Sequence, residues 1–538
     1  MSESDLPVVE MIRPRWGNPR TPGSLPAVAE QALGMLGVHG PRPAVGAADV
    51  DLPASVLSDD ARGALEAVVG AEHVSVDAAV RRQHTRGYSL PDLLKLRAGD
   101  ASDAPDAVVF PGSHDDVLDL LAVCARHRIA VVPFAGGTSV VGGLVAARAG
   151  FTAVIALDVR RLDRLVAVDE VSRTAILEAG LRSPRAEELL AAHGFTLGHF
   201  PQSYEGASIG GYAAARSAGQ SSAGYGRFDE MVVGLVVATP QGTLRLGTAP
   251  RSAAGPDLRQ LILGSEGAFG VITSVTVEVR PTPVERVFEA WRFPSFVDGA
   301  AALRVLAQDG PLPTVLRLSD EAETAINLAD PTGASGGAGS AGGCVVIAGY
   351  EGEPDEVAQR RAGATARFAR AGGESLGPDA GEAWRTGRYR GPYLRDPLLD
   401  AGILVETLET ATFWSNLHPL KAAVTTALAE ALAEQGTPAL VLCHVSHVYP
   451  SGASLYFTVV CAQAADPVAQ WHAAKARANA TIRGAGATIT HHHGVGTDHR
   501  EALAEEIGPL AVEALRAVKH ILDPAGILNP GVLIAPGH

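Results

Sequence analysis

Short apolar runs alternate with amphipathic stretches between residues 108 and 279. Residues 108–111 and 130–133 are compact apolar runs, which predict two strands. Between them Ser113 precedes Asp116 in capping-box spacing, and apolar residues then recur at helical spacing as far as Cys124. This order predicts the α+β character of a nucleotide-binding domain. Further strands are expected at residues 154–157, 165–168, 175–179, 231–239 and 271–279, and a further helix at residues 184–193.

The pattern changes after about residue 281. Strands are expected at residues 288–293 and 344–349, and helices at 355–371 and 503–522. A Gly/Ser/Ala tract at residues 332–343 predicts a flexible loop. We therefore divide the chain into four parts: an N-terminal arm with a helical region (1–100), a first α+β domain (101–281), a second α+β domain (282–500), and a C-terminal helical segment that returns to the first domain (501–538).

Composition and charge narrow the class of protein. The 538 residues carry a formal charge of −15, which argues against a nucleic-acid partner because that would need a basic face. The 4 cysteines form no C-x-x-C pair, so we expect buried free thiols rather than a disulfide framework. We recognise no signal peptide, apolar membrane span or peroxisomal signal. We expect a cytoplasmic protein, and leave open both an association with the inner face of the membrane and a homodimeric state.

A glycine loop follows the predicted strand at residues 130–133. Because glycine has no Cβ, successive backbone N–H groups in such a loop can approach an anion closely and form a nest for phosphate oxygens. The loop matches neither G-x-G-x-x-G nor the Walker pattern, which argues against those two kinds of site. An ordinary glycine-rich turn is the alternative. The loop consists of Pro133, Phe134, Ala135, Gly136, Gly137, Thr138 and Ser139.

The surroundings of this loop resemble a known superfamily. The strings at residues 109–117, 133–140, 208–212, 264–273 and 523–530 are similar in order and spacing to the vanillyl-alcohol oxidase / p-cresol methylhydroxylase flavoproteins. The resemblance implies an α+β fold in which a two-subdomain domain binds FAD and an α+β cap domain covers the flavin. It places the pyrophosphate on the glycine loop and the remaining cofactor against Gln202, Ser203, Tyr204, Glu205, Gly206, Ala207, Ser208, Ala215, Arg216, Ser217, Ala218, Gly264, Ser265, Glu266, Gly267, Ala268, Phe269 and Gly270. Since no histidine stands at a recognisable attachment point, we expect noncovalent FAD.

The most unusual string of the second domain is His491-His492-His493-Gly494. On an extended segment side chains alternate, so the three histidines are not expected to face one way. Metal sites usually have spaced ligands, so we predict no metal here. Histidine titrates near neutrality, which favours an acid/base cluster, with a packed hydrogen-bonded network as the alternative.

This string narrows the resemblance to the alkyldihydroxyacetone-phosphate synthase family. D-lactate and glycolate dehydrogenases of the superfamily commonly show Glu-His-Gly here, whereas this chain has His492-His493-Gly494. The strings at residues 84–99, 313–320, 393–396, 406–414 and 452–457 are also similar to that family. The resemblance implies an FAD-dependent enzyme that exchanges the acyl group of acyl-dihydroxyacetone phosphate for a long-chain alcohol without net redox change. The runners-up are an FAD-linked dehydrogenase or oxidase of a 2-hydroxy acid and a flavin-binding protein without catalysis.

Four further positions are candidates for this chemistry. Arg395 offers a fork of donors for the substrate phosphate, with an ion pair to Asp396 or Glu406 as the alternative. Tyr456 either removes a proton, if nearby cations lower its pKa, or orients the substrate as a donor, with a half-buried strand tyrosine as the alternative. We place Arg317 near the flavin or a hinge, with an exposed strand arginine as the alternative, and Thr407 as a weaker substrate contact.

Overall fold

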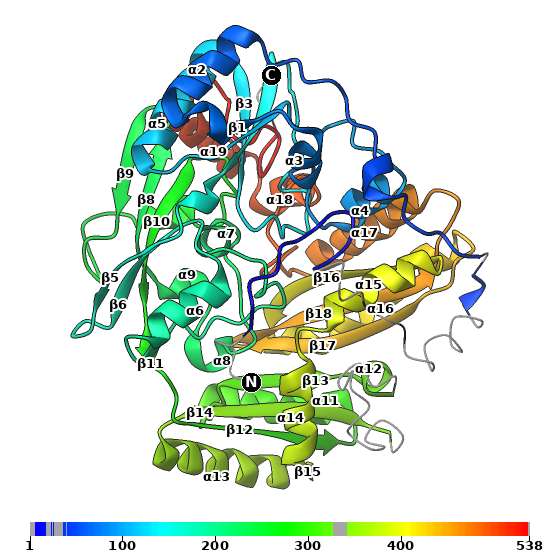
Figure 1. Cartoon of the computed structure of the whole chain (residues 1–538). Coiled ribbons are helices and arrows are strands. Elements are labelled where there is room, and N and C mark those ends of the chain that lie inside the picture. Colours follow the sequence, from blue (N-terminus) through cyan, green and yellow to red (C-terminus); the bar gives the residue numbers. More distant parts are fainter. Residues whose placement is uncertain are drawn as a thin grey trace.

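The computed structural model describes residues 6–17, 23, 25, 36–38, 40–325 and 342–535 (Figure 1). Its first part contains a four-stranded sheet in the order β1-β2-β4-β3, in which β2, β4 and β3 are parallel. The helix predicted after Ser113 is confirmed, because the Ser113 side chain accepts a hydrogen bond from the backbone N–H of Asp116. The elements are β1 (Val74–Ser75), β2 (Ala107–Val109), β3 (Ile129–Phe134), β4 (Ala153–Asp158), α2 (Asp59–Val69), α3 (Ala78–Gln83), α4 (Leu90–Arg97) and α5 (His114–His127).

A five-stranded antiparallel sheet in the order β5-β6-β10-β8-β9 lies beside the first sheet, and one hydrophobic core joins the two. The core is continuous because both sheets and α5 contribute apolar side chains to it. The elements are β5 (Leu165–Asp169), β6 (Thr174–Glu178), β7 (Phe195–Thr196), β8 (Val232–Thr239), β9 (Gly242–Leu246), β10 (Val271–Glu278), β11 (Arg280–Pro281), α6 (Ser183–Ala191), α7 (Ile209–Ala215), α8 (Ser222–Tyr225), α9 (Phe228–Met231) and α10 (Arg259–Ile262).

The second part is a seven-stranded antiparallel sheet in the order β15-β12-β14-β13-β17-β18-β16. Apolar side chains on one face pack against α11, α13, α16 and α17 in a second core. The elements are β12 (Glu285–Phe293), β13 (Val315–Ser319), β14 (Cys344–Gly352), β15 (Glu374–Gly377), β16 (Ile403–Phe413), β17 (Leu440–Val448), β18 (Gly452–Ala462), α11 (Phe296–Asp309), α12 (Glu321–Ala325), α13 (Pro354–Arg370), α14 (Pro378–Gly387), α15 (Gly391–Asp400), α16 (Leu417–Ala433) and α17 (Pro467–Gly484).

The end of the described chain returns to the first part (Figure 1). The single helix expected at residues 503–522 is wrong, since Gly508 and Pro509 divide this region into α18 (Arg500–Ile507) and α19 (Pro509–Leu522). Gly508 has a φ of 80°, which ends the first helix, and Pro509 begins the second. Leu528 then bridges to Val131 of β3.

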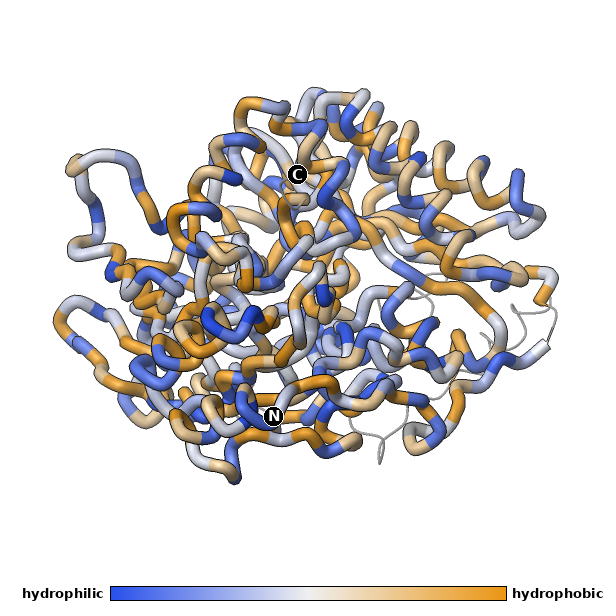
Figure 2. Tube along the Cα trace, turned by 90° about the horizontal axis from the view of Figure 1, so that it is seen from above, coloured by the Kyte–Doolittle hydropathy of each residue, from blue (hydrophilic) through white to orange (hydrophobic). Residues whose placement is uncertain are grey.

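The loop expected at residues 332–343 falls largely outside the described residues, which resume at 342. Hydrophobic and hydrophilic positions alternate along the helices in Figure 2. Among the described residues, no helix is both long enough and apolar enough to cross a membrane.

Candidate active site

The strands of the large sheet divide their side chains between two faces. In β16, β17 and β18, Leu408, Val445 and Leu455 point to the helix-covered core. Because successive side chains alternate, Glu409, His444 and Tyr456 point to the opposite face. The register places them side by side, with Tyr456 opposite both His444 and Glu409. Glu409, His444 and Tyr456 thus form a row of polar side chains on the face of the sheet opposite its hydrophobic core.

Glu409 organises the histidine run. Its side chain is 1% exposed and accepts hydrogen bonds from the backbone N–H groups of His491, His492 (3.2 Å) and His493 (3.0 Å), and from the Thr490 hydroxyl (2.6 Å). Burial raises the pKa of this carboxyl, but the nearby His493 and these hydrogen bonds outweigh burial and hold the pKa below its usual value. Glu409 is therefore a buried carboxylate that fixes three successive peptide groups.

The prediction that the three histidines cannot face one way is wrong. The segment is not an extended strand, because one carboxylate draws its three N–H groups to the same point. His492 and His493 both contact the Tyr456 ring, with centroid distances of 6.1 and 5.5 Å. His491 Nδ1 lies 2.9 Å from His492 Nδ1. The run consequently forms one cluster over the sheet.

His447 joins this cluster from β17. Its ring lies 4.8 Å from that of His491 and 5.0 Å from that of His492, and candidate ligand atoms of these three residues lie within 4.8 Å of one another. The ring nitrogens are nevertheless used in hydrogen bonds: His491 Nε2 with the Tyr449 hydroxyl at 2.6 Å, His447 Nδ1 with Ser446 at 2.8 Å, and His447 Nε2 with the Gly219 carbonyl at 3.2 Å. This arrangement is a hydrogen-bonded network, and burial lowers the pKa of His447, His491 and His492 well below the usual value.

Tyr456 is a protonated phenol in this environment. Burial raises its pKa to about 12 and outweighs the opposite effect of Arg395, so the condition set for a proton-removing role, a lowered pKa, is not met. Its hydroxyl donates a hydrogen bond to Thr407 Oγ1 at 3.0 Å, and its ring stacks on His444 at 4.8 Å. These contacts favour a donor that orients a substrate over a group that removes a proton.

The two predicted arginines are held by carboxylates. Arg317 Nη2 lies 2.5 Å from Glu323 Oε1 and 3.1 Å from His444 Nδ1, and its side chain is only 14% exposed. It is therefore no exposed strand arginine, and it contacts the His444 ring that stacks on Tyr456. Arg395 Nη1 lies 3.3 Å from Glu406 Oε2, which is one of the two ion pairs considered for it.

The four segments expected to bind the cofactor come together in the first part. A Cβ on Gly136 would lie 2.4 Å from the Gly206 carbonyl oxygen, and one on Gly267 would lie 2.7 Å from Pro133. Within the segment at residues 215–218, Ser217 Oγ lies 3.0 Å from His199 Nε2. Tyr204 is fully buried and stacks on Tyr389, so its ring belongs to an aromatic core.

The glycine loop has backbone N–H donors that lack an acceptor in the described part of the chain. Among the described residues, none accepts a hydrogen bond from the backbone N–H groups of Gly136, Gly137, Thr138 and Ser139. Gly137 has a φ of 68°, a conformation that favours glycine. Partly buried N–H groups without a protein acceptor call for a ligand that supplies one, and an anion is the best such ligand.

Comparison with known proteins decides the family. Residues 105–247 match the family profile described as "FAD binding domain", and residues 282–533 match "FAD linked oxidases, C-terminal domain". The alkyldihydroxyacetonephosphate synthase of Trypanosoma brucei brucei is 32% identical over 90% of this chain and 82% of its own length. This chain belongs to the alkyldihydroxyacetonephosphate synthase family. A solved alkyldihydroxyacetonephosphate synthase superposes with a TM-score of 0.81 at 26% identity, covering 98% of this chain and 97% of its own.

The predicted fold is confirmed: an FAD-binding α+β domain of p-cresol methylhydroxylase type with a cap domain. The structure of p-cresol methylhydroxylase with substrate bound superposes with a TM-score of 0.66 over 89% of this chain and 97% of its own. At 17% identity that likeness concerns the fold alone. Members of the alkyldihydroxyacetonephosphate synthase family are FAD proteins, and the free N–H groups of the glycine loop fit the pyrophosphate of that cofactor.

The loop at residues 264–270, which is predicted to bind FAD, contacts the segment that directly follows the histidine run. Glu266, in a predicted FAD loop, accepts hydrogen bonds from the backbone N–H groups of Val495 and Gly496, both at 2.8 Å. Burial raises the pKa of Glu266 to about 7. Asn529 Nδ2 donates to the carbonyls of Gly143 (3.0 Å) and Glu266 (2.7 Å). Hydrogen bonds therefore join the predicted FAD loop to the segment that carries the histidine run.

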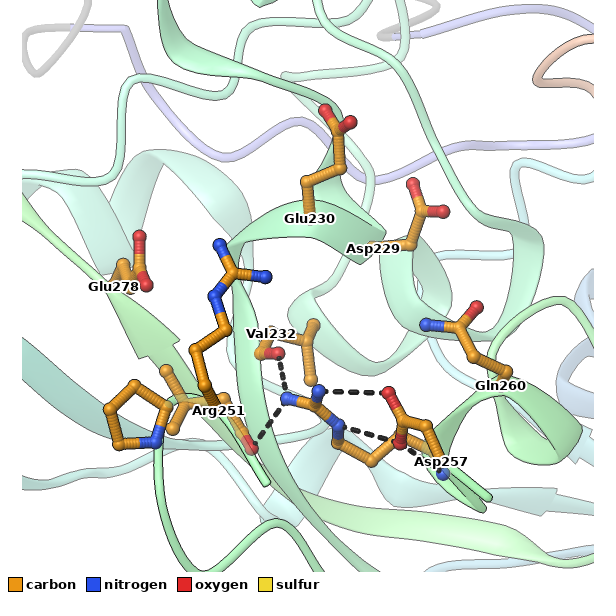
Figure 3. A pocket seen from close by; sticks show the side chains of 10 residues that line it. Asp229, Glu230, Val232, Arg251, Asp257, Gln260 and Glu278 are labelled. Carbon is orange, nitrogen blue, oxygen red and sulfur yellow. Dashed lines mark hydrogen bonds and ion pairs between the residues drawn. The ribbon is translucent and has the colours of Figure 1, made fainter. Parts of the chain in front are cut away.

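A separate hollow of about 280 Å³ lies beside the predicted FAD residue Arg216, whose guanidinium bonds to Asp229 and Gln260 of its wall. Another wall residue, Arg259, is held by Asp257 and by the carbonyls of Val232 and Val233. Figure 3 shows this hollow, with Asp257 and Val232 among the labelled residues. No residue of the histidine cluster lines this hollow.

Four members of the cluster were not predicted to be functional: Glu409, His444, His447 and Tyr449. Each is a polar residue within or beside a largely buried strand of the seven-stranded sheet. A polar side chain in a buried strand needs a partner, and that is the signal that could have found them.

Proposed function

We propose that this protein exchanges the acyl group of acyl-dihydroxyacetone phosphate for a long-chain alcohol, and so makes an ether-lipid precursor. The observation that carries the proposal is the single cluster of Glu409, the three-histidine run and Tyr456 beside the FAD loops. Membership of the alkyldihydroxyacetonephosphate synthase family supports the same reaction. FAD, when bound, supplies an electrophilic ring that can hold the reacting carbon without net oxidation or reduction.

The reaction requires proton movement that the imidazoles can perform. Exchange of a carboxylate for an alcohol releases one proton from the alcohol oxygen. His491 and His492 are neutral because burial lowers their pKa values well below the usual value, so each has a ring nitrogen able to accept a proton. The contacts from Tyr449 through His491 to His492 form a relay along which the proton can pass.

The remaining residues orient the substrate. Arg395 has N–H groups beyond the one that contacts Glu406, and a guanidinium fork suits a phosphate. The Tyr456 hydroxyl donates a hydrogen bond to Thr407 and could donate to a substrate oxygen instead. Arg317 positions Tyr456 through Glu323 and His444.

One experiment separates the candidate functions. The purified holoprotein is incubated with acyl-dihydroxyacetone phosphate and a labelled long-chain alcohol. Release of fatty acid together with an alkali-stable ether product is the expected result. Reduction of a dye by D-lactate or glycolate, with no ether product, would instead support a 2-hydroxy-acid dehydrogenase and reject the proposal.

A further inference from the structure

Arg13, on the N-terminal arm, is a buried cation without an acidic partner. Its side chain belongs to a residue that is 2% exposed, and burial lowers its pKa. Its guanidinium donates to backbone carbonyls only: Arg86 at 3.0 Å, Gly137 at 2.8 Å and Met11 at 3.4 Å. Among the described carboxylates, none forms an ion pair with it. Burial lowers its pKa more than the nearby Asp92 and Asp158 raise it, so a further anion close by would stabilise this buried cation.

Arg13 holds one of the peptides of the glycine loop whose N–H group has no acceptor among the described residues. It binds the carbonyl oxygen of Gly137, and in a trans peptide the following N–H, that of Thr138, points the opposite way. Fixing the carbonyl therefore aims the Thr138 N–H away from Arg13, on the side where no described residue accepts it. The Ser139 carbonyl is held in the same manner by the backbone N–H of Tyr88 at 2.6 Å.

A second arginine approaches the neighbouring glycine. A Cβ on Gly137 would lie 2.7 Å from Arg13 Nη2, and a Cβ on Gly136 would lie 3.2 Å from Arg182 Nη1. Arg182 also donates to the Gly206 carbonyl, and its only described carboxylate contact is Glu10 at 3.6 Å. Two positive head groups thus flank the two glycines of the loop.

The arm is docked independently of Arg13. The backbone N–H of Val9 donates to the Glu205 carbonyl at 2.9 Å, and that of Trp16 donates to Asp396 at 2.7 Å. Arg15 Nη1 lies 2.8 Å from Asp400, a carboxylate that Arg97 also binds. Figure 1 shows the arm, in dark blue, between the first part and the large sheet. Arg13 is therefore presented to the loop by a segment with other anchors.

We propose that Arg13 of the N-terminal arm, together with Arg182, belongs to the FAD-binding site: Arg13 orients the glycine-loop peptide that binds the pyrophosphate, and the two guanidinium groups balance its negative charge. The inference rests on the proposed assignment of the pyrophosphate to residues 133–139. It makes the arm part of the cofactor site rather than a structural extension.

The test measures FAD release from the holoprotein after dilution, followed by the recovery of flavin fluorescence, and needs no turnover. Arg13→Met is expected to release FAD about ten- to a hundredfold faster, because a charge-assisted hydrogen bond and a nearby cation are lost. Arg13→Lys keeps the charge but not the fork, so release about three- to tenfold faster is expected. Arg15→Met is the matched control on the same arm, and its release rate should equal that of the wild type because Arg97 still holds Asp400.

The role of Arg13 and the assignment of the pyrophosphate to residues 133–139 can fail separately. A wild-type release rate in Arg13→Met, or equal acceleration in Arg15→Met, overturns the role of Arg13. If Arg13→Met does not fold, Arg13→Lys decides, with an unchanged rate overturning the role. Gly137→Val tests the loop itself, because its Cβ would meet Arg13 and its φ is unsuitable for valine. Retention of FAD by that variant at the wild-type rate would reject the pyrophosphate assignment, and the inference with it.

Discussion

The predicted cofactor loop and the histidine cluster offer different chemical groups to their ligands. The loop at residues 133–139 offers backbone N–H groups, and its key residues are contiguous in sequence. The cluster uses side chains of β13, β16, β17 and β18 together with the run at residues 491–493, so that its members lie up to 176 positions apart in the chain, from Arg317 to His493. We therefore expect a substitution in the loop to lower FAD affinity and a substitution in the cluster to lower turnover. The following variants test this separation.

The largest effect is expected from Glu409→Ala. Without the carboxylate, three buried N–H groups lose their acceptor and the histidine run loses its shape. Ether-product formation should fall about a thousandfold, while the FAD content stays that of the wild type. Glu434→Ala removes an exposed carboxylate and serves as the control. Turnover of Glu409→Ala within tenfold of the wild type would contradict the organising role.

Tyr456→Phe should have a smaller effect. The ring still stacks on His444, but the hydroxyl that donates to Thr407 is gone. We expect kcat to fall about a hundredfold with FAD release unchanged. Thr407→Val removes the same hydrogen bond but keeps the phenol, so it should cost less than tenfold. Equal losses in the two variants would mean that the hydrogen bond matters and the phenol does not.

Arg395→Met should act mainly on substrate binding. Loss of a guanidinium from a phosphate site is expected to raise KM about ten- to a hundredfold with a smaller change in kcat. The variant also leaves Glu406 without its partner, so the double variant Arg395→Met/Glu406→Gln separates the two effects. A normal KM in the double variant would assign the effect to the unpaired carboxylate instead.

The smallest effect is expected at the joint between the two regions. The folded-state pKa of Glu266 is raised to about 7 from 4.5, so the folded protein binds more protons than the unfolded chain between these values. The stability from this group is present below pH 4.5 and is lost as the pH rises through 7. Glu266→Gln should lack this loss and be more stable at pH 8 by about 1–3 kcal/mol. Denaturant unfolding at pH 5 and pH 8 measures it, and parallel curves for both proteins would refute it.

The histidine run shows how far sequence reasoning reaches. The string itself identified the family, but its side-chain directions were predicted wrongly because the alternation rule assumes an extended backbone. The carboxylate that bends this segment is Glu409, 82 residues earlier in the chain than its first hydrogen-bonded N–H. No local pattern records such a partner.

The direction of the Tyr456 pKa shift, which the sequence left open, also depends on distant residues. Cations lie near it, as expected, but Arg395 and Arg317 are held by Glu406 and Glu323. Burial then dominates and raises the pKa to about 12. Burial is a property of the assembled cap, and the spacing of residues along the chain does not contain it.

The helices and strands of the FAD-binding part, the glycine loop and the family could be recognised from the chain alone, because hydrophobic periodicity, glycine conformation and contiguous motifs are local properties. The folded structure was needed to show that Glu409 gathers the histidines, that Tyr456 keeps its proton, and that Arg13 of the arm binds the glycine loop. These depend on burial and on contacts between distant segments, since a charge or hydrogen bond acquires its energy from its surroundings.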